Sequence, residues 1–433
     1  MLRIWPVAAL MLSLMPVVSA AADDVGALRT ELQALKDEYG ARVDALEARI
    51  QELEADSGAP AATANPSAFN PSISLVLGGS YTNTSRDPET WNIAGFPSSG
   101  GEVGPGERSF NLGESELTFA ANIDPYFAGQ LTAAITGENE IEVEEAFVRT
   151  TALPQGFTGK LGRFFSGVGY LNEVHAHAWD FADQPLVYQA MFGGQSRQDG
   201  AQVKWLAPTD LFIEFGAEVG AGDSFPATRD DGNGLNTTAV FAHLGGDVGD
   251  YTSWRAGLSR IDSSAVAREG GIADASGAPL FETFTGDSHT WVVDGVLKWA
   301  PSPRRQLKLQ GEYMRREETG EVFDGGGVRL ADDYRGTHSG WYLQSVYQFA
   351  PRWRVGARYD SLDSGTPRYS LAPDGLLSQD PDRLSLMLDW NPSEFSRLRA
   401  QYDWDDARDD GDTDRVFRLQ YLYGIGAHGA HKY

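Results

Sequence analysis

Leu384-Ser385-Leu386-Met387-Leu388-Asp389-Trp390 alternates large apolar side chains with side chains that are mostly polar. Successive side chains of a β-strand point to opposite faces, so the leucines and Trp390 would share one face and Ser385 and Asp389 the other. The same period of two recurs in Ile73-Ser74-Leu75, Leu117-Thr118-Phe119 and Trp254-Arg255-Ala256. An apolar face opposite a polar face, repeated along the chain, is typical of a transmembrane barrel with a wet interior.

Short turns separate the expected strands. Most contain proline or glycine, and they recur at Asp124-Pro125, Leu153-Pro154-Gln155-Gly156, Ala207-Pro208-Thr209-Asp210, Gly249-Asp250, Ala300-Pro301-Ser302-Pro303, Ala350-Pro351 and Asn391-Pro392-Ser393. Longer polar segments lie between them, except near Gly137-Glu138-Asn139. Short periplasmic turns that alternate with longer outer loops are typical of outer-membrane barrels. Seven turns and eight loops predict an all-β transmembrane barrel of 16 antiparallel strands over residues 72–433.

The first residues resemble a secretory signal peptide. Arg3 is the only charge before Asp23, an apolar run extends from Val7 to Val18, and Val18-Ser19-Ala20 resembles a cleavage site. The apolar run is shorter than the roughly 20 residues that a spanning helix needs, which disfavours the alternative of a membrane anchor. We therefore expect a signal peptide over residues 1–20 and export to the bacterial outer membrane.

A helical segment is expected over residues 21–56, followed by a linker over residues 57–71. Apolar residues recur at coiled-coil spacing, with a stutter beside Gly40: Leu28, Leu32, Leu35, Tyr39, Val43, Leu46, Ile50 and Leu53. About four heptads make a weak helix alone, so self-association in the periplasm is the economical interpretation. The alternative is a single solvated helix or one that lies against peptidoglycan. The linker is rich in Ala, Pro, Ser and Asn.

Composition excludes several classes of protein. The chain has 49 glycines and many aromatic residues (11 Trp, 16 Tyr and 21 Phe), yet its mean hydropathy is −0.34, which suits a barrel in which alternate residues meet lipid. It has no cysteine, so a disulfide framework and thiolate metal sites are excluded. A net charge of −26 argues against nucleic acid as a partner. The G-x-S-x-G, H-E-x-x-H and phosphate-loop motifs are absent, and we predict no enzyme activity.

The polar phase of the strands carries acids early in the chain and bases late in it. The predicted pore-lining residues are acidic Glu114, Glu116, Glu142, Glu144, Glu214 and Glu218, and basic Arg352, Arg354, Arg358, Arg397, Arg399 and Arg418. If strands distant in sequence are also distant around the barrel, the acids face the bases across the lumen and create a transverse field. The alternative is that these charges pair with one another and fill a wet interior.

The third outer loop, residues 166–197, is rich in aromatic and apolar residues, and we expect it to fold inward as a constriction. Its polar residues include Glu173, His175, His177, Asp180 and Asp183. The i, i+2 spacing of the two histidines, with acids nearby, predicts a Zn²⁺ or Cu²⁺ site at His175 and His177. The alternative is that they are hydrogen-bonded loop residues. The tail histidines His428 and His431 form a second candidate, and His243 a third.

Two family resemblances follow from particular segments. Val143-Glu144-Glu145-Ala146-Phe147-Val148, the Leu-Pro-Gln-Gly-Phe turn and Lys160-Leu161-Gly162-Arg163-Phe164-Phe165 resemble the phosphate-selective porin O and P family, which implies a trimeric, 16-stranded outer-membrane channel. The segments from Gly104 to Glu107 and from Asn122 to Tyr126, and the His-containing tail, resemble uncharacterised proteins labelled zinc-regulated TonB-dependent outer-membrane receptors. This second resemblance implies a metal-linked role.

Two classes of function therefore stand. The first is a porin-like channel for small hydrophilic solutes or ions, with the loop 166–197 as constriction. The second is a metal-capturing, receptor-like barrel, or a protein that tethers the envelope through the coiled coil. The expected partners are outer-membrane lipid, two further copies of the chain in a homotrimer, and peptidoglycan. We expect no cofactor, with Zn²⁺ entering only as a bound or transported ion.

Overall fold

The computed structural model describes residues 71–100, 103–135, 140–228, 233–272, 279–373 and 376–426. The predicted signal peptide and coiled coil, and all of the predicted linker except Pro71, lie outside these residues. His428 and His431 also lie outside them.

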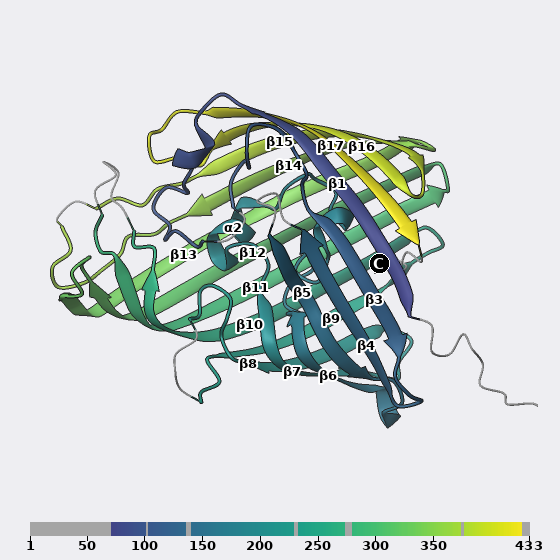
Figure 1. Ribbon diagram of the computed structural model, residues 1–433, viewed down its shortest axis with the longest axis horizontal. Helices are drawn as coiled ribbons and strands as arrows, with labels where there is room; N and C mark the ends of the chain where they lie inside the picture. Colours follow the sequence, from purple (N-terminus) through teal and green to yellow (C-terminus); the bar gives the residue numbers. More distant parts are fainter. Residues whose placement is uncertain are drawn as a thin grey trace, which may run out of the picture. The chain divides into compact units, whose positions relative to one another are not determined.

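Seventeen strand segments form one antiparallel sheet within the described residues (Figure 1). They are β1 (Ser72–Thr84), β2 (Ser109–Asn111), β3 (Ser115–Asn122), β4 (Phe127–Ile135), β5 (Ile141–Thr150), β6 (Phe157–Phe165), β7 (Arg197–Leu206), β8 (Phe212–Gly220), β9 (Thr237–Val248), β10 (Thr252–Glu269), β11 (Thr283–Ser302), β12 (Arg305–Phe323), β13 (Arg329–Ala350), β14 (Trp353–Asp363), β15 (Asp382–Ser393), β16 (Ser396–Asp406) and β17 (Asp414–Gly426). The helices are α2 (Leu186–Phe192) and the 3-10 turns η2 (Pro88–Thr90), η3 (Pro154–Gly156) and η4 (Ala176–Ala178).

The sheet closes into a barrel because the first strand pairs with the last. β1 pairs with β17 from Ser74 opposite Gly426 to Thr84 opposite Val416. On its other side β1 pairs with both β2 and β3, which are therefore two parts of one broken wall strand. The wall thus has 16 positions, as predicted, and each of the seven predicted short turns joins two neighbouring strands. Among the described residues, no helix is both long and apolar enough to cross a membrane.

The two faces of each strand divide as the alternation predicts. On β15 the leucines at 384, 386 and 388 are exposed outward, whereas Ser385, Met387 and Asp389 are buried inside the barrel. Outward apolar side chains of this kind contact lipid, and the inward face meets the interior.

The wall is taller on one side, where β10–β13 are 18 to 22 residues long. On β11 the exposed Trp299 and Trp291 bound an apolar outer stretch, and beyond Trp291 the outward phase continues with His289 and Asp287. Aromatic side chains mark the edges of the lipid band, and roughly ten residues of a tilted strand cross it. The charged ends of these strands therefore project beyond the lipid, and Figure 1 shows them running past β3–β9.

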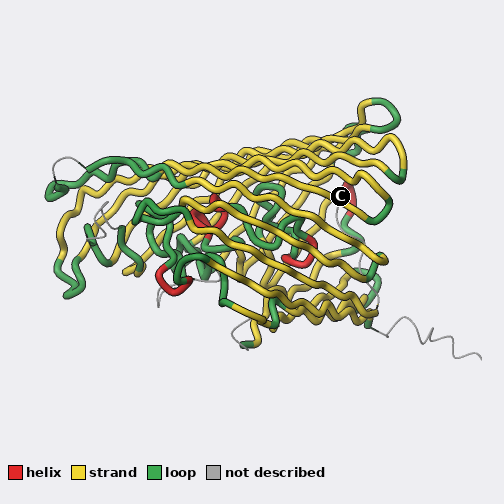
Figure 2. The backbone as a smooth tube through the Cα atoms, turned by 90° about the horizontal axis from the view of Figure 1, so that it is seen from above, coloured by secondary structure: helices red, strands yellow, loops and turns green. Residues whose placement is uncertain are grey.

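The connection from β6 to β7, residues 166–196, lies inside the ring of strands (Figure 2) and is called the interior loop below. Every residue of its helix α2 is buried. The helix packs in one apolar cluster with lumen-facing Val292, Met314 and Tyr342 of β11–β13. Gly193, at φ 64°, ends the helix in the left-handed conformation that glycine adopts most easily. An apolar core inside the barrel thus holds helix α2 of the interior loop.

Candidate functional site

A cavity of about 1390 Å³ lies in the barrel beside the interior loop. Loop residues from Tyr170 to Asp180 line one part of it, and residues of the short turns, such as Asp250 and Ala300, line another. Its charged lining is mixed, with Lys or Arg at 149, 160, 204, 298, 308, 354 and 397 and Asp or Glu at 116, 145, 173, 180, 247 and 250. A cavity with charged side chains of both signs therefore separates the interior loop from the short-turn end of the barrel.

At one side of the barrel the loop presents imidazoles to a carboxylate-rich wall. His175 Nδ1 lies 3.1 Å from Glu116 Oε2 of β3 and 3.2 Å from Glu144 Oε2 of β5. His175 Nε2 lies 3.1 Å from Glu145 Oε2. His177 Nδ1 lies 2.6 Å from Glu116 Oε1. Burial lowers the pKa of His175, but its hydrogen bonds to the three carboxylates outweigh burial and raise that pKa well above its usual value.

A β-bulge explains why two consecutive glutamates reach this cluster. Glu145 pairs with Thr132 and Val143 with Ala133, so Glu144 is an extra residue in β5. A bulge re-aims side chains locally, and here both Glu144 and Glu145 are buried inside the barrel. Simple alternation predicts only Glu144 inside and misses Glu145. The adjacent acids in an otherwise alternating strand are the signal that could have revealed it.

At the other side the loop presents carboxylates to an arginine-rich wall. Asp180 lies 2.9 Å from Lys308 Nζ of β12 and 2.8 Å from Arg354 Nη1 of β14. The two Asp183 oxygens contact Arg358 Nη2 of β14 at 2.8 Å and Arg383 Nη1 of β15 at 3.0 Å.

These cations decide the charge state of both loop carboxylates. Burial alone would raise the pKa of Asp180 and of Asp183. Lys308 and Arg354 outweigh burial at Asp180, and Arg383 and Arg358 do so at Asp183, so both pKa values lie well below the usual range. The interior loop therefore carries a charge complementary to each wall that it meets.

Further contacts hold the ends of the interior loop. Asn172 Nδ2 donates to the carbonyl oxygens of Ser166 and Ser196, which ties the two ends together. Glu218 of β8 accepts from Ser166 Oγ at 2.5 Å and from the Gly167 N–H at 2.8 Å. These bonds satisfy buried polar groups and fix where the loop leaves the wall.

Predicted residues outside these clusters have different surroundings. Glu114 lies in the break between β2 and β3, and Glu142 pairs with Arg197 at the start of β7. Glu214 accepts from His243 Nδ1 at 3.0 Å if that nitrogen carries the proton. Glu173 of the loop lies 3.1 Å from Lys204 Nζ.

The predicted basic residues also have different partners. Arg397 and Arg399 donate to backbone oxygens of the loop at 177 and 179, and Arg418 pairs with Asp403. Arg352 lies outside the strand that was expected to carry it. It is exposed in the turn between β13 and β14, because its strand begins only at Trp353.

The expected opposition of acids and bases holds only in part. Closure of the barrel through β1 leaves a single strand between β3, which carries Glu116, and β17, which carries Arg418. These acidic and basic walls therefore flank β1. Glu214 and Glu218 on β8 lie about half-way round the ring from the arginines of β15 and β16. Sequence distance fails as a guide here because the two chain ends meet in a closed sheet.

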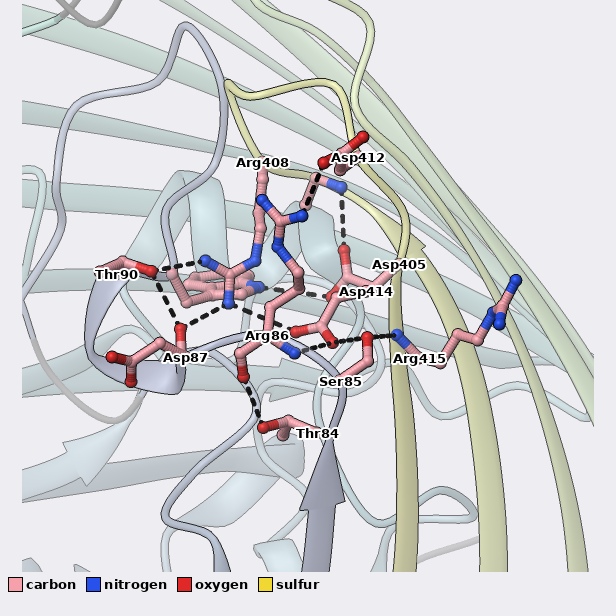
Figure 3. A network of polar contacts seen from close by, with 12 residues as sticks. Thr84, Ser85, Arg86, Asp87, Thr90, Asp405, Arg408, Asp412, Asp414 and Arg415 are labelled. Carbon is pink, nitrogen blue, oxygen red and sulfur yellow. Dashed lines mark hydrogen bonds and ion pairs between the residues drawn. The ribbon is translucent and has the colours of Figure 1, made fainter.

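A second polar network joins the loops on the long-loop side, where β1 ends and β17 begins (Figure 3). Asp414 accepts from Ser85 Oγ at 2.8 Å, from the Arg86 N–H at 3.1 Å and from Arg408 Nη2 at 3.3 Å. The Arg86 guanidinium also pairs with Asp412 at 2.6 Å and with Asp410. The network links the connection that follows β1 to the connection between β16 and β17, next to the pairing of β1 with β17 that closes the barrel.

The closed 16-position wall with a polar interior and an inserted loop is the fold of outer-membrane porins. A solved structure of the loop L8 deletion mutant of OmpT from Vibrio cholerae is 11% identical, covers 82% of this chain and 99% of that chain, and gives a TM-score of 0.54. The anion-selective porin from Comamonas acidovorans is 10% identical over 82% and 99% of the two chains, with a TM-score of 0.51. The outer-membrane channel DcaP of Acinetobacter baumannii is 12% identical over 82% and 97%, with a TM-score of 0.50.

No family model matches the sequence. An uncharacterised protein of Aquifex aeolicus (strain VF5) is 31% identical over 396 residues, which cover 84% of this chain and 80% of the relative. The chain belongs to the same family as this protein.

Proposed function

We propose that the protein is an outer-membrane channel for small hydrophilic solutes or ions, narrowed by the interior loop. One observation carries the proposal. The loop spans from Glu116 on β3 to Arg358 and Arg383 on β14 and β15, with a cavity of about 1390 Å³ lined by charges of both signs beside it. A loop held by charge at both sides of a wet barrel sets the size and the field of the remaining passage.

The charges in the cavity support weak ion selectivity. Its lining mixes seven Lys or Arg residues with six Asp or Glu residues. Lys308 pairs with Asp180, and Arg354 pairs with both Asp180 and Asp389, so these wall cations do not form a row of unpaired charges. We therefore expect no strong preference for phosphate over chloride, although the resemblance to phosphate-selective porins predicts one.

We also propose the partners that a channel of this fold needs. Lipid would surround the outward apolar face of strands such as β15. A solved OmpT structure from Vibrio cholerae is described as a trimer form, and it supports a homotrimer for this chain. An attachment to peptidoglycan through residues 21–56, in the periplasm, stays a prediction. So does the expectation that the chain is not an enzyme.

The channel proposal is tested by single-channel recording in planar bilayers with the purified full-length chain. Discrete conductance steps, in triplets for a trimer, would support it, and the reversal potential in a salt gradient would give the ion preference. Replacing chloride by phosphate on one side tests anion choice directly. Folded protein that inserts and gives no current would overturn the channel proposal and favour the metal-capturing or tethering alternative.

A further inference from the structure

The cluster that joins the interior loop to β3 and β5 has the composition of a transition-metal site. It contains carboxylates of Glu116 and Glu144 and the imidazole of His175, and the nearest donor atoms of these three groups all lie within 4.8 Å of one another. The ring of His177 stacks on that of His175 with centroids 5.8 Å apart, and its Nδ1 contacts Glu116. Four side chains from three separate segments thus converge on one small volume.

Two of the three separations between donor atoms are close to those around a tetrahedral ion. His175 Nδ1 lies 3.1 Å from Glu116 Oε2 and 3.2 Å from Glu144 Oε2. In a tetrahedral zinc site with bonds of about 2.0–2.1 Å, neighbouring ligand atoms lie about 3.3 Å apart. An ion could therefore bind with small side-chain adjustments.

The second ring nitrogen of His175 adds an independent argument. Its Nε2 lies 3.1 Å from Glu145 Oε2, and the same oxygen accepts from Gln130 Nε2 at 3.0 Å. A carboxylate that receives one imidazole N–H leaves the other nitrogen as a lone pair, which is how metal-ligating histidines are commonly oriented. The other ring nitrogen, Nδ1, faces the Glu116 and Glu144 carboxylates, so one nitrogen and two carboxylates point at the same small volume.

Access and ligand type favour a particular kind of cation. Glu116, His175 and His177 line the cavity, so a hydrated ion can reach them. Imidazole nitrogen combined with carboxylate oxygen suits Zn²⁺ and related divalent transition metals, whereas Mg²⁺ and Ca²⁺ prefer oxygen ligands alone.

We propose that Glu116, Glu144 and His175 bind a divalent transition-metal ion such as Zn²⁺, with His177 or water as the fourth ligand and Glu145 as the residue that orients His175. The bound ion links the interior loop to both β3 and β5. The site is distinct from the arginine-rich contacts of Asp180 and Asp183, and it does not depend on whether the barrel conducts.

The test is a Zn²⁺ titration of the full-length chain in detergent against a chromophoric chelator. It is made in a His428→Ala/His431→Ala background, so that the tail histidines contribute nothing. We expect one Zn²⁺ per chain and little competition from Mg²⁺ at equal concentration. His175→Ala should weaken binding at least tenfold, since even an orienting residue contributes about 10–100-fold. His289→Ala is the matched control, because His289 is half-exposed and pairs with Asp262 away from the loop.

Each outcome decides the proposal. Loss of binding in His175→Ala with retention in His289→Ala supports it. If His175→Ala fails to fold, the nearly isosteric Glu144→Gln takes its place with the same expected loss. The proposal is overturned if the background protein binds no Zn²⁺, which would mean that a proton alone bridges the carboxylates, or if neither variant weakens binding.

Discussion

Asp183 of the interior loop lies 3.0 Å from Arg383 of β15, and both side chains are buried inside the barrel. The same carboxylate lies 2.8 Å from Arg358 of β14 and 3.6 Å from Arg418 of β17. One loop carboxylate thus contacts guanidinium groups from three wall strands. Removing one partner of a buried ion pair leaves uncompensated charge and costs about 3–5 kcal/mol. The position of the loop therefore depends on Asp183 more than on any exposed charge.

Neutralising the two loop carboxylates should release the loop from the basic wall. In Asp180→Asn/Asp183→Asn the wall keeps Lys308, Arg354 and Arg383, but the loop offers them no negative charge. We expect single-channel currents that are larger on average and that fluctuate between levels, with a shift toward anion preference.

The matched control is Asp332→Asn, which changes an exposed acid on the outer part of β13. It should leave the conductance and its noise unchanged. Steady, wild-type currents from the double variant would show that the apolar packing of α2 alone holds the loop.

Glu312 of β12 anchors the interior loop near its start and at helix α2. Its carboxylate accepts from the N–H groups of Tyr170 and Leu171 at 3.1 and 3.0 Å, and from the hydroxyls of Tyr188 and Tyr342 at 2.9 and 2.7 Å. Glu312→Ala removes the acceptor of these buried donors. Each donor left without a partner lowers the free energy of unfolding by about 1–3 kcal/mol. We expect a clear drop in the free energy of unfolding, measured by urea titration in lipid vesicles.

The matched change on the same strand is Glu317→Ala, whose side chain is 51% exposed on the outer face. A surface change of this kind stays within about 0.5 kcal/mol. Equal effects of Glu312→Ala and Glu317→Ala would contradict an anchoring role for Glu312.

The outward face of β15 should reject charge. Leu386 is exposed near the middle of that face, between Leu384 and Leu388. Leu386→Arg should cost about 2–4 kcal/mol of unfolding free energy in vesicles, because it places a cation in lipid. Leu377→Arg, the same change in the connection from β14 to β15, should cost almost nothing since Leu377 is 80% exposed in an outer loop. If Leu386→Arg left the free energy of unfolding unchanged, this face would not lie in the bilayer.

Much of the barrel could be predicted because its determinants are local. Alternation depends on neighbouring residues, and a short turn depends on two to four, so segments such as 384–390 and Ala350-Pro351 reveal both the face and the reversal. The inward position of the loop 166–196 also followed from its apolar and aromatic content, since such residues are poorly placed in bulk water.

What could not be predicted depends on pairing between strands. The bulge at Glu144 is a register shift against β4, and it brings Glu145 into the carboxylate cluster around His175. Closure of β1 on β17 determines which walls are neighbours, so Glu116 lies near the basic wall although it is distant from it in sequence. Arg352 has the same alternation as Arg354 and Arg358, but it precedes the first residue of β14, Trp353. Phase alone does not show where a strand starts.

The depressed pKa of Asp183 predicts how its contribution to stability depends on pH. The side chain faces Arg358, Arg383 and Arg418, together with acidic Asp403 and the Gln401 amide, and the arginines outweigh burial. A carboxyl whose folded pKa is lowered contributes stability above its unfolded pKa of about 3.9 and loses it as the pH falls toward the folded value.

We therefore expect the difference in unfolding free energy between wild type and Asp183→Asn to be constant from pH 7 to pH 5 and to shrink only below about pH 4. Urea titration in vesicles at pH 7, 5 and 3 measures that difference, and subtraction of the variant cancels the titration of unrelated acids. A difference that already shrinks between pH 7 and pH 5 would mean that burial dominates over the three arginines. In that case Asp183 would be protonated near neutral pH, and the loop would be held by packing instead of by charge.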